Sequence, residues 1–198
     1  MSKWLNPVKL SGDLITLEPL ALSHIDGLKT TVADGELWDL WYTTAPEPAQ
    51  VSDYISSALS DYDQGHALPF AVIRQSDGLV VGTTRYLNAD VKNKRLEIGN
   101  TFYAKSVQRT GVNTECKHLL LQYAFEQLRC MAVEFRTHFH NMPSRAAITR
   151  LGAKQEGVLR NHKIDRFGLI RDTVVFSILD NEWPAVKKSL EFKMGRKY

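Results

Sequence analysis

A strand, a glycine-containing loop and a long helix follow one another between Glu97 and Leu128, and this segment constrains the fold more than any other. Residues 95–103 (RLEIGNTFY) have the pattern of a strand, and apolar spacing from about Asn113 to Leu128 predicts a helix. Gly111 lies in the loop just before that helix. Because the first N–H groups of a helix have no partner within it, several of them can bind one anion, such as a phosphate.

Two other phosphate-binding motifs compete for this region. Residues 99–106 (GNTFYAKS) nearly match the nucleotide P-loop, but Ala104 replaces the glycine before the lysine, and the run begins inside the predicted strand. A dinucleotide-binding fold needs G-x-G-x-x-G at a helix start, and the sequence has no such triplet. A simpler interpretation stays open, in which Gly111 only turns the chain and Asn113 or Thr114 only caps the helix.

The rest of the chain predicts further strands and helices around this segment. Alternating or apolar runs predict strands at residues 13–20, 68–74, 79–87, 132–139, 154–163 and 172–179. Apolar spacing predicts helices at residues 51–62 and 144–151, another from a Ser23 cap through Val32, and a terminal one from Asn181. The Asp77-Gly78 pair predicts a hairpin between the second and third of these strands. The expected fold class is therefore α/β or α+β with a mixed sheet.

Composition and length limit the kind of protein. The 198 residues, 43% of them apolar, contain no internal repeat, linker or low-complexity stretch, so residues 1–198 are expected to form a single domain. No run approaches the roughly 18 apolar residues of a membrane span, and the first residues lack the apolar run of a secretory signal. A cytoplasmic protein without membrane contact is therefore predicted.

Charge and cysteine usage narrow the expected partners. The net charge of +3 is spread along the chain apart from a basic tail, so a nucleic-acid partner is not expected. Cys116 and Cys130 have no second pair for a metal site, so reduced, partly buried thiols and no metal are expected.

The central strand-loop-helix segment resembles motif A of the GNAT superfamily of N-acetyltransferases. Its loop signature, Q/R-x-x-G-x-G/A, is met by Gln108 and Gly111, whereas Asn113 departs from it at the last small position. Residues 141–144 (NMPS) and 151–153 (LGA) are similar to the second conserved block of the superfamily, and the chain is similar to its RimJ/RimL-like branch. The resemblance implies the GNAT fold, with a mostly antiparallel central sheet of about seven strands flanked by helices.

The same resemblance implies acetyl-CoA as co-substrate and an amine as acceptor, with a homodimer as one assembly. The residues it assigns to acetyl-CoA binding are Phe102, Tyr103, Gln108, Arg109, Thr110, Gly111, Val112, Asn113, Thr114 and Asn141. A backbone N–H near the first two of these would polarise the thioester carbonyl. The amine would attack the thioester directly in a ternary complex, without a covalent enzyme intermediate.

A primary amine must lose a proton before it attacks, so a base is needed. Glu97, in the strand beside the thioester, is the first candidate. The alternative is an ordinary strand carboxylate that faces Arg85 or Arg136 on a neighbouring strand. His138 and His140 are the reserve bases.

The departing thiolate needs a proton, and many GNAT members supply it from a tyrosine seven residues after the asparagine of the second block. Ile148 occupies that position here. Ser144 is the candidate replacement, although a serine here is equally suited to cap a helix. Lys163 lies near a position where the RimL branch can carry a glutamate, so specificity for ribosomal proteins is not implied.

The acceptor is less constrained than the co-substrate. By resemblance, the aromatic patch places Trp41 and Tyr42 in one wall of the acceptor cleft, whereas Trp38 is expected to pack in the core. The acceptor is a protein N-terminal amine or a small amine such as a polyamine, aminoglycoside or amino acid. A non-catalytic acyl-CoA-binding module and an RNA-associated protein are the alternatives from other classes.

Overall fold

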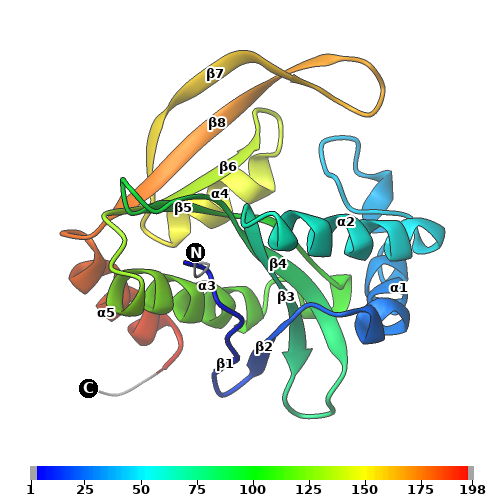
Figure 1. Ribbon diagram of the computed structural model, residues 1–198, viewed down its shortest axis with the longest axis horizontal. Helices are drawn as coiled ribbons and strands as arrows, with labels where there is room; N and C mark the ends of the chain where they lie inside the picture. Colours follow the sequence, from blue (N-terminus) through cyan, green and yellow to red (C-terminus); the bar gives the residue numbers. More distant parts are fainter. Residues whose placement is uncertain (1–3, 196–198) are drawn as a thin grey trace.

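The computed structural model describes residues 4–195 as one eight-stranded sheet with helices on both faces (Figure 1). The end of the basic tail, residues 196–198, lies outside the described residues. The sheet order is β1-β2-β3-β4-β5-β6-β8-β7. Its strands are β1 (Leu10–Ser11), β2 (Ile15–Pro19), β3 (Ala67–Arg74), β4 (Val80–Asp90), β5 (Arg95–Tyr103), β6 (Ala132–His138), β7 (Lys154–Ile164) and β8 (Ile170–Leu179).

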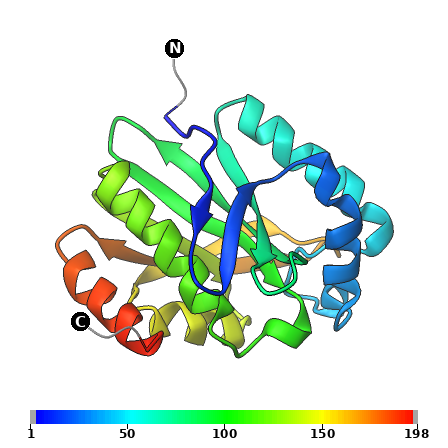
Figure 2. The same ribbon diagram turned by 90° about the horizontal axis from the view of Figure 1, so that it is seen from below.

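The helices divide between the two faces, as Figures 1 and 2 show. The α-helices are α1 (Ile25–Ala33), α2 (Val51–Asp63), α3 (Val112–Gln122), α4 (Met142–Arg150) and α5 (Trp183–Lys193). The short helical turns are η1 (Leu22–His24), η2 (Leu37–Asp39), η3 (Pro48–Gln50), η4 (Lys105–Val107) and the π-helix η5 (Tyr123–Gln127). The larger core packs α3, α4 and α5 on one face, and the smaller packs α1 and α2 on the other.

The predicted fold class is confirmed, with corrections at element ends. The sheet has eight strands instead of about seven, because the two-residue strand β1 pairs with β2 at its edge. The helix expected from a Ser23 cap begins at Ile25, and η1 precedes it. The helix predicted to Leu128 ends as α3 at Gln122 and continues as η5.

Strand pairing opens the sheet at its centre. All neighbouring strands are antiparallel except β5 and β6, which are parallel. Their register joins Arg95 to Ala132, Leu96 to Val133 and Glu97 to Glu134, and within the described residues it goes no further. From Ile98 onward the edge of β5 therefore faces an opening instead of a strand.

Glu115 fastens the start of α3 to the beginning of the sheet. Its buried carboxylate accepts the backbone N–H groups of Asp13, Leu14 and Ile15 at 2.8, 2.7 and 2.9 Å. An acidic side chain is also favourable in the first turn of a helix. The two cysteines are free, as predicted, and both are fully buried instead of partly buried. Over residues 4–195, no helix is long and apolar enough to cross a membrane.

Candidate active site

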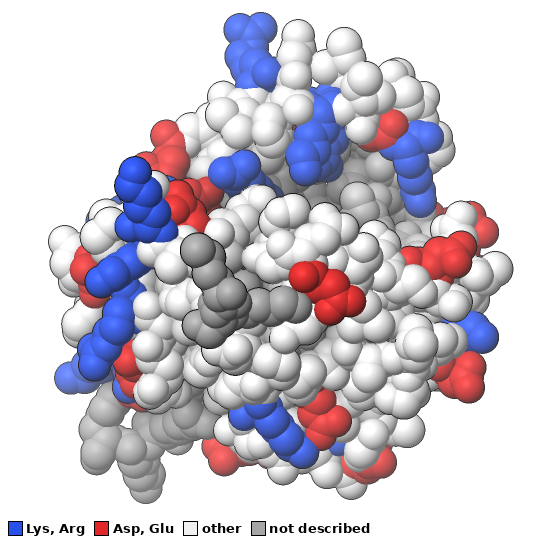
Figure 3. All heavy atoms as spheres, in the orientation of Figure 1, with Lys and Arg blue, Asp and Glu red and all other residues white. Residues whose placement is uncertain are grey.

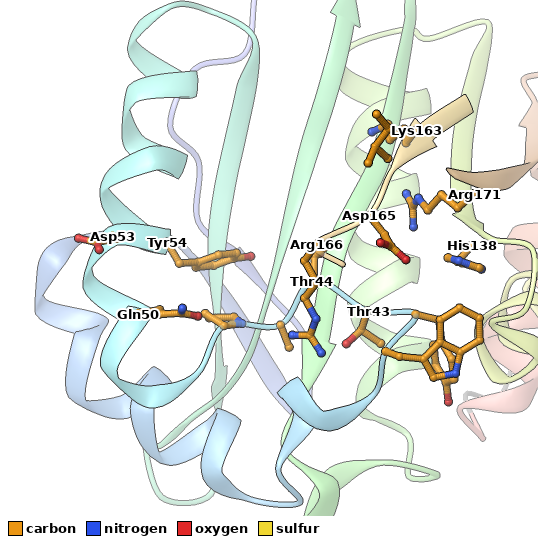
Figure 4. Close-up of a pocket in the computed structure, with 15 residues that line it drawn as sticks. Thr43, Thr44, Gln50, Asp53, Tyr54, His138, Lys163, Asp165, Arg166 and Arg171 are labelled. Carbon is orange, nitrogen blue, oxygen red and sulfur yellow. The ribbon is translucent and has the colours of Figure 1, made fainter. Parts of the chain in front are cut away.

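The opening between β5 and β6 leads into a cavity of about 1000 Å³, within the size range of small-molecule sites. It extends from the loop before α3 to the far strands β7 and β8. The predicted site residues that line it are Tyr42, Glu97, Phe102, Tyr103, Gln108, Arg109, Asn113, Asn141 and Ser144. A second cavity of about 530 Å³, drawn in Figure 4, adjoins it, and Trp41 and Tyr42 both line this one.

The loop before α3 differs in detail from the predicted glycine turn. Gly111 is the N-cap with φ of −67°, a conformation open to any residue, whereas Arg109 has φ of +60°. A Cβ added to Gly111 would lie 2.8 Å from Cδ1 of Leu14, so the position favours a small residue. Because the first amides of α3 lack partners within the helix, the loop can hold an anion, and Arg109 adds a cation beside it.

The two threonine hydroxyls of this loop are engaged within the protein. Thr110 Oγ1 donates to the carbonyl oxygen of Val107 at 2.6 Å. Thr114 is buried, and its Oγ1 accepts from Nη2 of Arg150 at 3.2 Å. Neither threonine lines the larger cavity, and the side chain of Val112 lies in the core. The Thr110 hydroxyl also accepts from the backbone N–H of Val112 at 3.3 Å, so both hydroxyls are occupied within the protein.

Glu97 projects into the larger cavity from β5 and is 7% exposed. Its Oε2 accepts from Nδ2 of Asn88 at 2.8 Å and lies 3.5 Å from Nε of Arg136. Burial raises the pKa of the Glu97 carboxyl, although the nearby Arg136 charge opposes the shift. The arginine contact expected of an ordinary strand carboxylate is present. Arg85 does not share it, because it pairs with Asp61 at 3.5 Å.

Ser144 lines the cavity without capping a helix. Asn141 is the N-cap of α4, and its side-chain oxygen accepts from the backbone N–H of Ser144 at 3.0 Å. The predicted capping role of Ser144 is therefore wrong, since the serine lies inside the first turn. Ile148, at the position where many GNAT members have a tyrosine acid, is buried and also lines the cavity.

The two reserve bases differ in placement, since His138, the last residue of β6, lines both cavities. His138 Nδ1 accepts from the backbone N–H of His140 at 3.0 Å, so the proton of the neutral ring is assigned to Nε2. That Nε2 is buried without a hydrogen-bond partner among the described residues. Burial and the charges of Arg171 and His140 lower the pKa of His138, which favours this neutral form. His140 is not among the residues that line either cavity.

The packing predicted for Trp38 is confirmed, whereas the acceptor role of Trp41 and Tyr42 stays a prediction. Trp38 packs against the smaller core, whereas Trp41 is 45% exposed. The Trp41 ring lies edge-on to His138, with centroids 4.9 Å apart, and to Tyr42, at 5.7 Å.

Lys117 is a cavity residue that the sequence interpretation missed. Its side chain is buried under β4 and β5, where Nζ donates to Oγ1 of Thr101 at 2.7 Å and to Oγ1 of Thr84 at 3.2 Å. Burial lowers its pKa to about 8. The available signal was its spacing, three and four residues before Leu120 and Leu121, which places it on the inner face of α3.

The site thus combines a mixed sheet that opens between two parallel strands with a helix start beside the opening, which is the arrangement that the resemblance to acetyltransferases implied. Residues 15–154 match the acetyltransferase (GNAT) domain model. The chain belongs to the GNAT acetyltransferase family and is an acetyl-CoA-dependent N-acetyltransferase. Within residues 4–195, no group of three or more His, Cys, Asp or Glu side chains could hold a metal ion.

Similar proteins agree with this assignment. A GCN5-related N-acetyltransferase from Brucella melitensis, known from its crystal structure, is 31% identical with a TM-score of 0.84, over 95% of this chain and 86% of that one. The Bacillus subtilis protein YdaF, provisionally named a ribosomal N-acetyltransferase, is 28% identical over 74% of this chain and 80% of its own. Mycobacterium smegmatis RimJ, solved with CoA-disulfide, shares the fold at 21% identity and a TM-score of 0.76, over 96% and 94% of the chains. The predicted superfamily is confirmed, and the YdaF match supports the RimJ/RimL-like branch.

Proposed function

We propose that this protein transfers the acetyl group of acetyl-CoA to a primary amine by direct attack in a ternary complex. The observation that carries the proposal is the larger cavity, because it joins the loop before α3 to Glu97 through the opening between β5 and β6. One space therefore holds both an anion-binding helix start and a buried carboxylate. Acetyl-CoA supplies the acetyl thioester, and the residues around it supply position and proton transfer.

The proposed roles follow from placement. Glu97 takes the proton of the attacking ammonium, because burial raises the pKa of its carboxyl toward the range in which general bases work near neutral pH. The unpaired edge of β5 near Phe102 presents backbone N–H groups to the thioester carbonyl. Ser144 gives a proton to the departing thiolate from the wall that Asn141 positions.

The acceptor that we propose first is a protein N-terminal amine, which the similarity to YdaF supports. A small amine is the second candidate, and the smaller cavity, proposed as the acceptor site, carries charges of both signs. That cavity contains Lys163, Arg166 and Arg171 against Asp53 and Asp165.

Calorimetry with acetyl-CoA, followed by thiol release against N-terminal peptides and small amines, tests the proposal. We expect binding and turnover in the wild type. Glu97→Gln should keep acetyl-CoA affinity and lower kcat by about 10²- to 10⁴-fold. Glu134→Gln is the matched control, because Glu134 also contacts Arg136, at 2.9 Å, but is not among the residues that line the cavity. Binding without turnover on any amine would support a non-catalytic acyl-CoA-binding module instead.

A further inference from the structure

Two cations face each other across the β7–β8 hairpin beside the proposed acceptor site. Lys163 on β7 is the register partner of Arg171 on β8, and both line the larger and the smaller cavity. Figure 4 shows the two side chains on the same side of the smaller cavity, with Asp165 and His138 beside them. Like charges directly opposite each other in a strand pair are destabilising, so this pairing needs an explanation.

Nearby acids act on the pair without forming an ion pair. Burial lowers the pKa of Arg171 and the Asp165 charge opposes that shift, whereas the charge of Lys163 acts on Glu97. Among residues 4–195, no ion pair involves Lys163 or Arg171. Asp165 Oδ1 instead accepts the backbone N–H groups of Phe167 and Leu169 at 2.8 and 2.9 Å. Arg171 is half-buried, and charged groups removed from water are normally paired.

A β-bulge in β7 lies just before Lys163. The register joins Leu159 to Thr173 and then Lys163 to Arg171, so four steps on β7 match two on β8. Asn161 lies within this bulge at φ of +50°. Bulges near active sites commonly redirect side chains. The bulge therefore sets the register that places Lys163 opposite Arg171.

We propose that Lys163 and Arg171 bind an oxyanionic group of the acceptor, which is therefore an amine that carries a carboxylate or phosphate close to its amino group. The inference rests on the proposed function and names its substrate class. A guanidinium forms paired hydrogen bonds with carboxylate or phosphate oxygens, and the lysine adds a point charge. The smaller cavity, which both cations line, includes no residue of the loop before α3. Because both cations also line the larger cavity, the acetyl-CoA affinity of the variants below separates this site from the place proposed for the CoA phosphates.

The two halves of the acceptor site lie close together. Lys163 is near enough to Glu97 for its charge to lower the pKa of that carboxyl, in opposition to burial. An acceptor can therefore place its amine at Glu97 and its anion at Lys163 within one cavity, as an amino acid would. Polyamines and aminoglycosides carry several positive charges and would be repelled by the same pair. Figure 3 shows further Lys and Arg side chains on the part of the surface that carries β7 and β8.

The test compares acceptors that differ only in the anionic group, by thiol release at fixed acetyl-CoA. The pairs are an amino acid and its carboxamide, a peptide beginning with Glu and the same peptide beginning with Gln, and O-phosphoethanolamine and ethanolamine; putrescine is added as a dication. We expect at least one anionic member to exceed its neutral partner by about 10-fold or more in kcat/KM. The favoured pair identifies the source of the anion.

Variants show whether the cations cause that preference. Lys163→Met and Arg171→Gln should each raise KM for the anionic acceptor about 10- to 100-fold, with acetyl-CoA affinity unchanged by calorimetry. Arg160→Gln is the matched control, since Arg160 is an exposed cation of β7 and is not among the residues that line either cavity.

Equal use of both members of every pair, preference for putrescine, or a preference that survives both variants would overturn the inference while leaving acetyl transfer intact. Failure of every amine to release thiol, despite acetyl-CoA binding, would instead overturn the proposed function, and the inference with it.

Discussion

Replacing the buried Lys117 with methionine should make the protein more stable at neutral pH. At 1.36 kcal/mol per pKa unit, the fall in the Lys117 pKa from 10.5 to about 8 makes its buried ammonium about 3 kcal/mol less favourable than an exposed one. Methionine has a similar length and no charge. The loss of the two threonine hydrogen bonds costs about 1 kcal/mol, because the Thr84 and Thr101 hydroxyls, 2.7 Å apart, still bond each other. The net gain expected at pH 7 is therefore about 2 kcal/mol.

The gain should depend on pH in a defined direction. Between pH 8 and 10.5 the unfolded chain retains a proton on Lys117 that the folded chain has lost, so wild-type stability rises with pH in this window. Below pH 8 the penalty is fully present. The advantage of Lys117→Met should therefore be largest at pH 7 and disappear by about pH 10.

Urea unfolding at pH 7 and pH 10, followed by tryptophan fluorescence, measures this difference. The contributions of other groups that titrate in the same pH range cancel when the free energy of unfolding of the wild type is subtracted from that of the variant. The matched control is Lys92→Met, which removes an exposed lysine and should change stability little at either pH. A Lys117→Met protein less stable than wild type at pH 7, with a difference that does not vary with pH, would refute the reasoning.

Three further predictions concern the site. In a plot of kcat/KM against pH, the fall on the acid side should have an apparent pKa above the usual carboxyl range, because burial raises the pKa of Glu97 and the base must be ionised. If the same fall persists in Glu97→Gln, it belongs to another group. Asn141→Ala should lower the free energy of unfolding by about 1 kcal/mol through loss of the cap, whereas Ser144→Ala should change it by no more than about 0.5 kcal/mol. Ser144→Ala should instead lower turnover more than it lowers acetyl-CoA affinity. Gly111→Asp should weaken acetyl-CoA binding by about 10-fold or more in calorimetry, since it adds a charge that repels phosphate. Tm should change little, because the added Cβ meets only Cδ1 at the end of the exposed Leu14 side chain. Retained affinity would contradict the loop assignment.

The elements were predictable where one periodicity runs without interruption. Strand β5 and helix α2 follow from alternation and from 3.6-residue spacing, and their observed bounds lie within one residue of the predicted ones. Element ends were less so, because they depend on local hydrogen bonds. The N-cap of α4 is Asn141 and not Ser144, since a polar residue three positions earlier supplies the oxygen. Nothing in the residues 123–127 marks the π-helix that extends α3.

The site was predictable within the segment 97–128, which resembles motif A of the superfamily. Glu97, Gln108 and Arg109 all line the larger cavity. The Lys163–Arg171 pair was missed as a unit, because it depends on the register of two strands and on a bulge, which a single sequence does not encode locally.

The carboxylate of Glu115 also determines where this protein can be shortened. A chain that began at Ile15, where the family match begins, would lack the N–H groups of Asp13 and Leu14 that this carboxylate accepts. Each hydrogen bond to a charged group contributes about 1.5–3 kcal/mol, so such a truncation would remove roughly 3 kcal/mol or more from the first turn of α3. Boundaries drawn from sequence similarity would therefore remove the contacts that hold the helix whose start is proposed to bind acetyl-CoA. If such a truncated protein were inactive, the loss of these contacts would explain the result, and nothing could be concluded from it about catalytic residues.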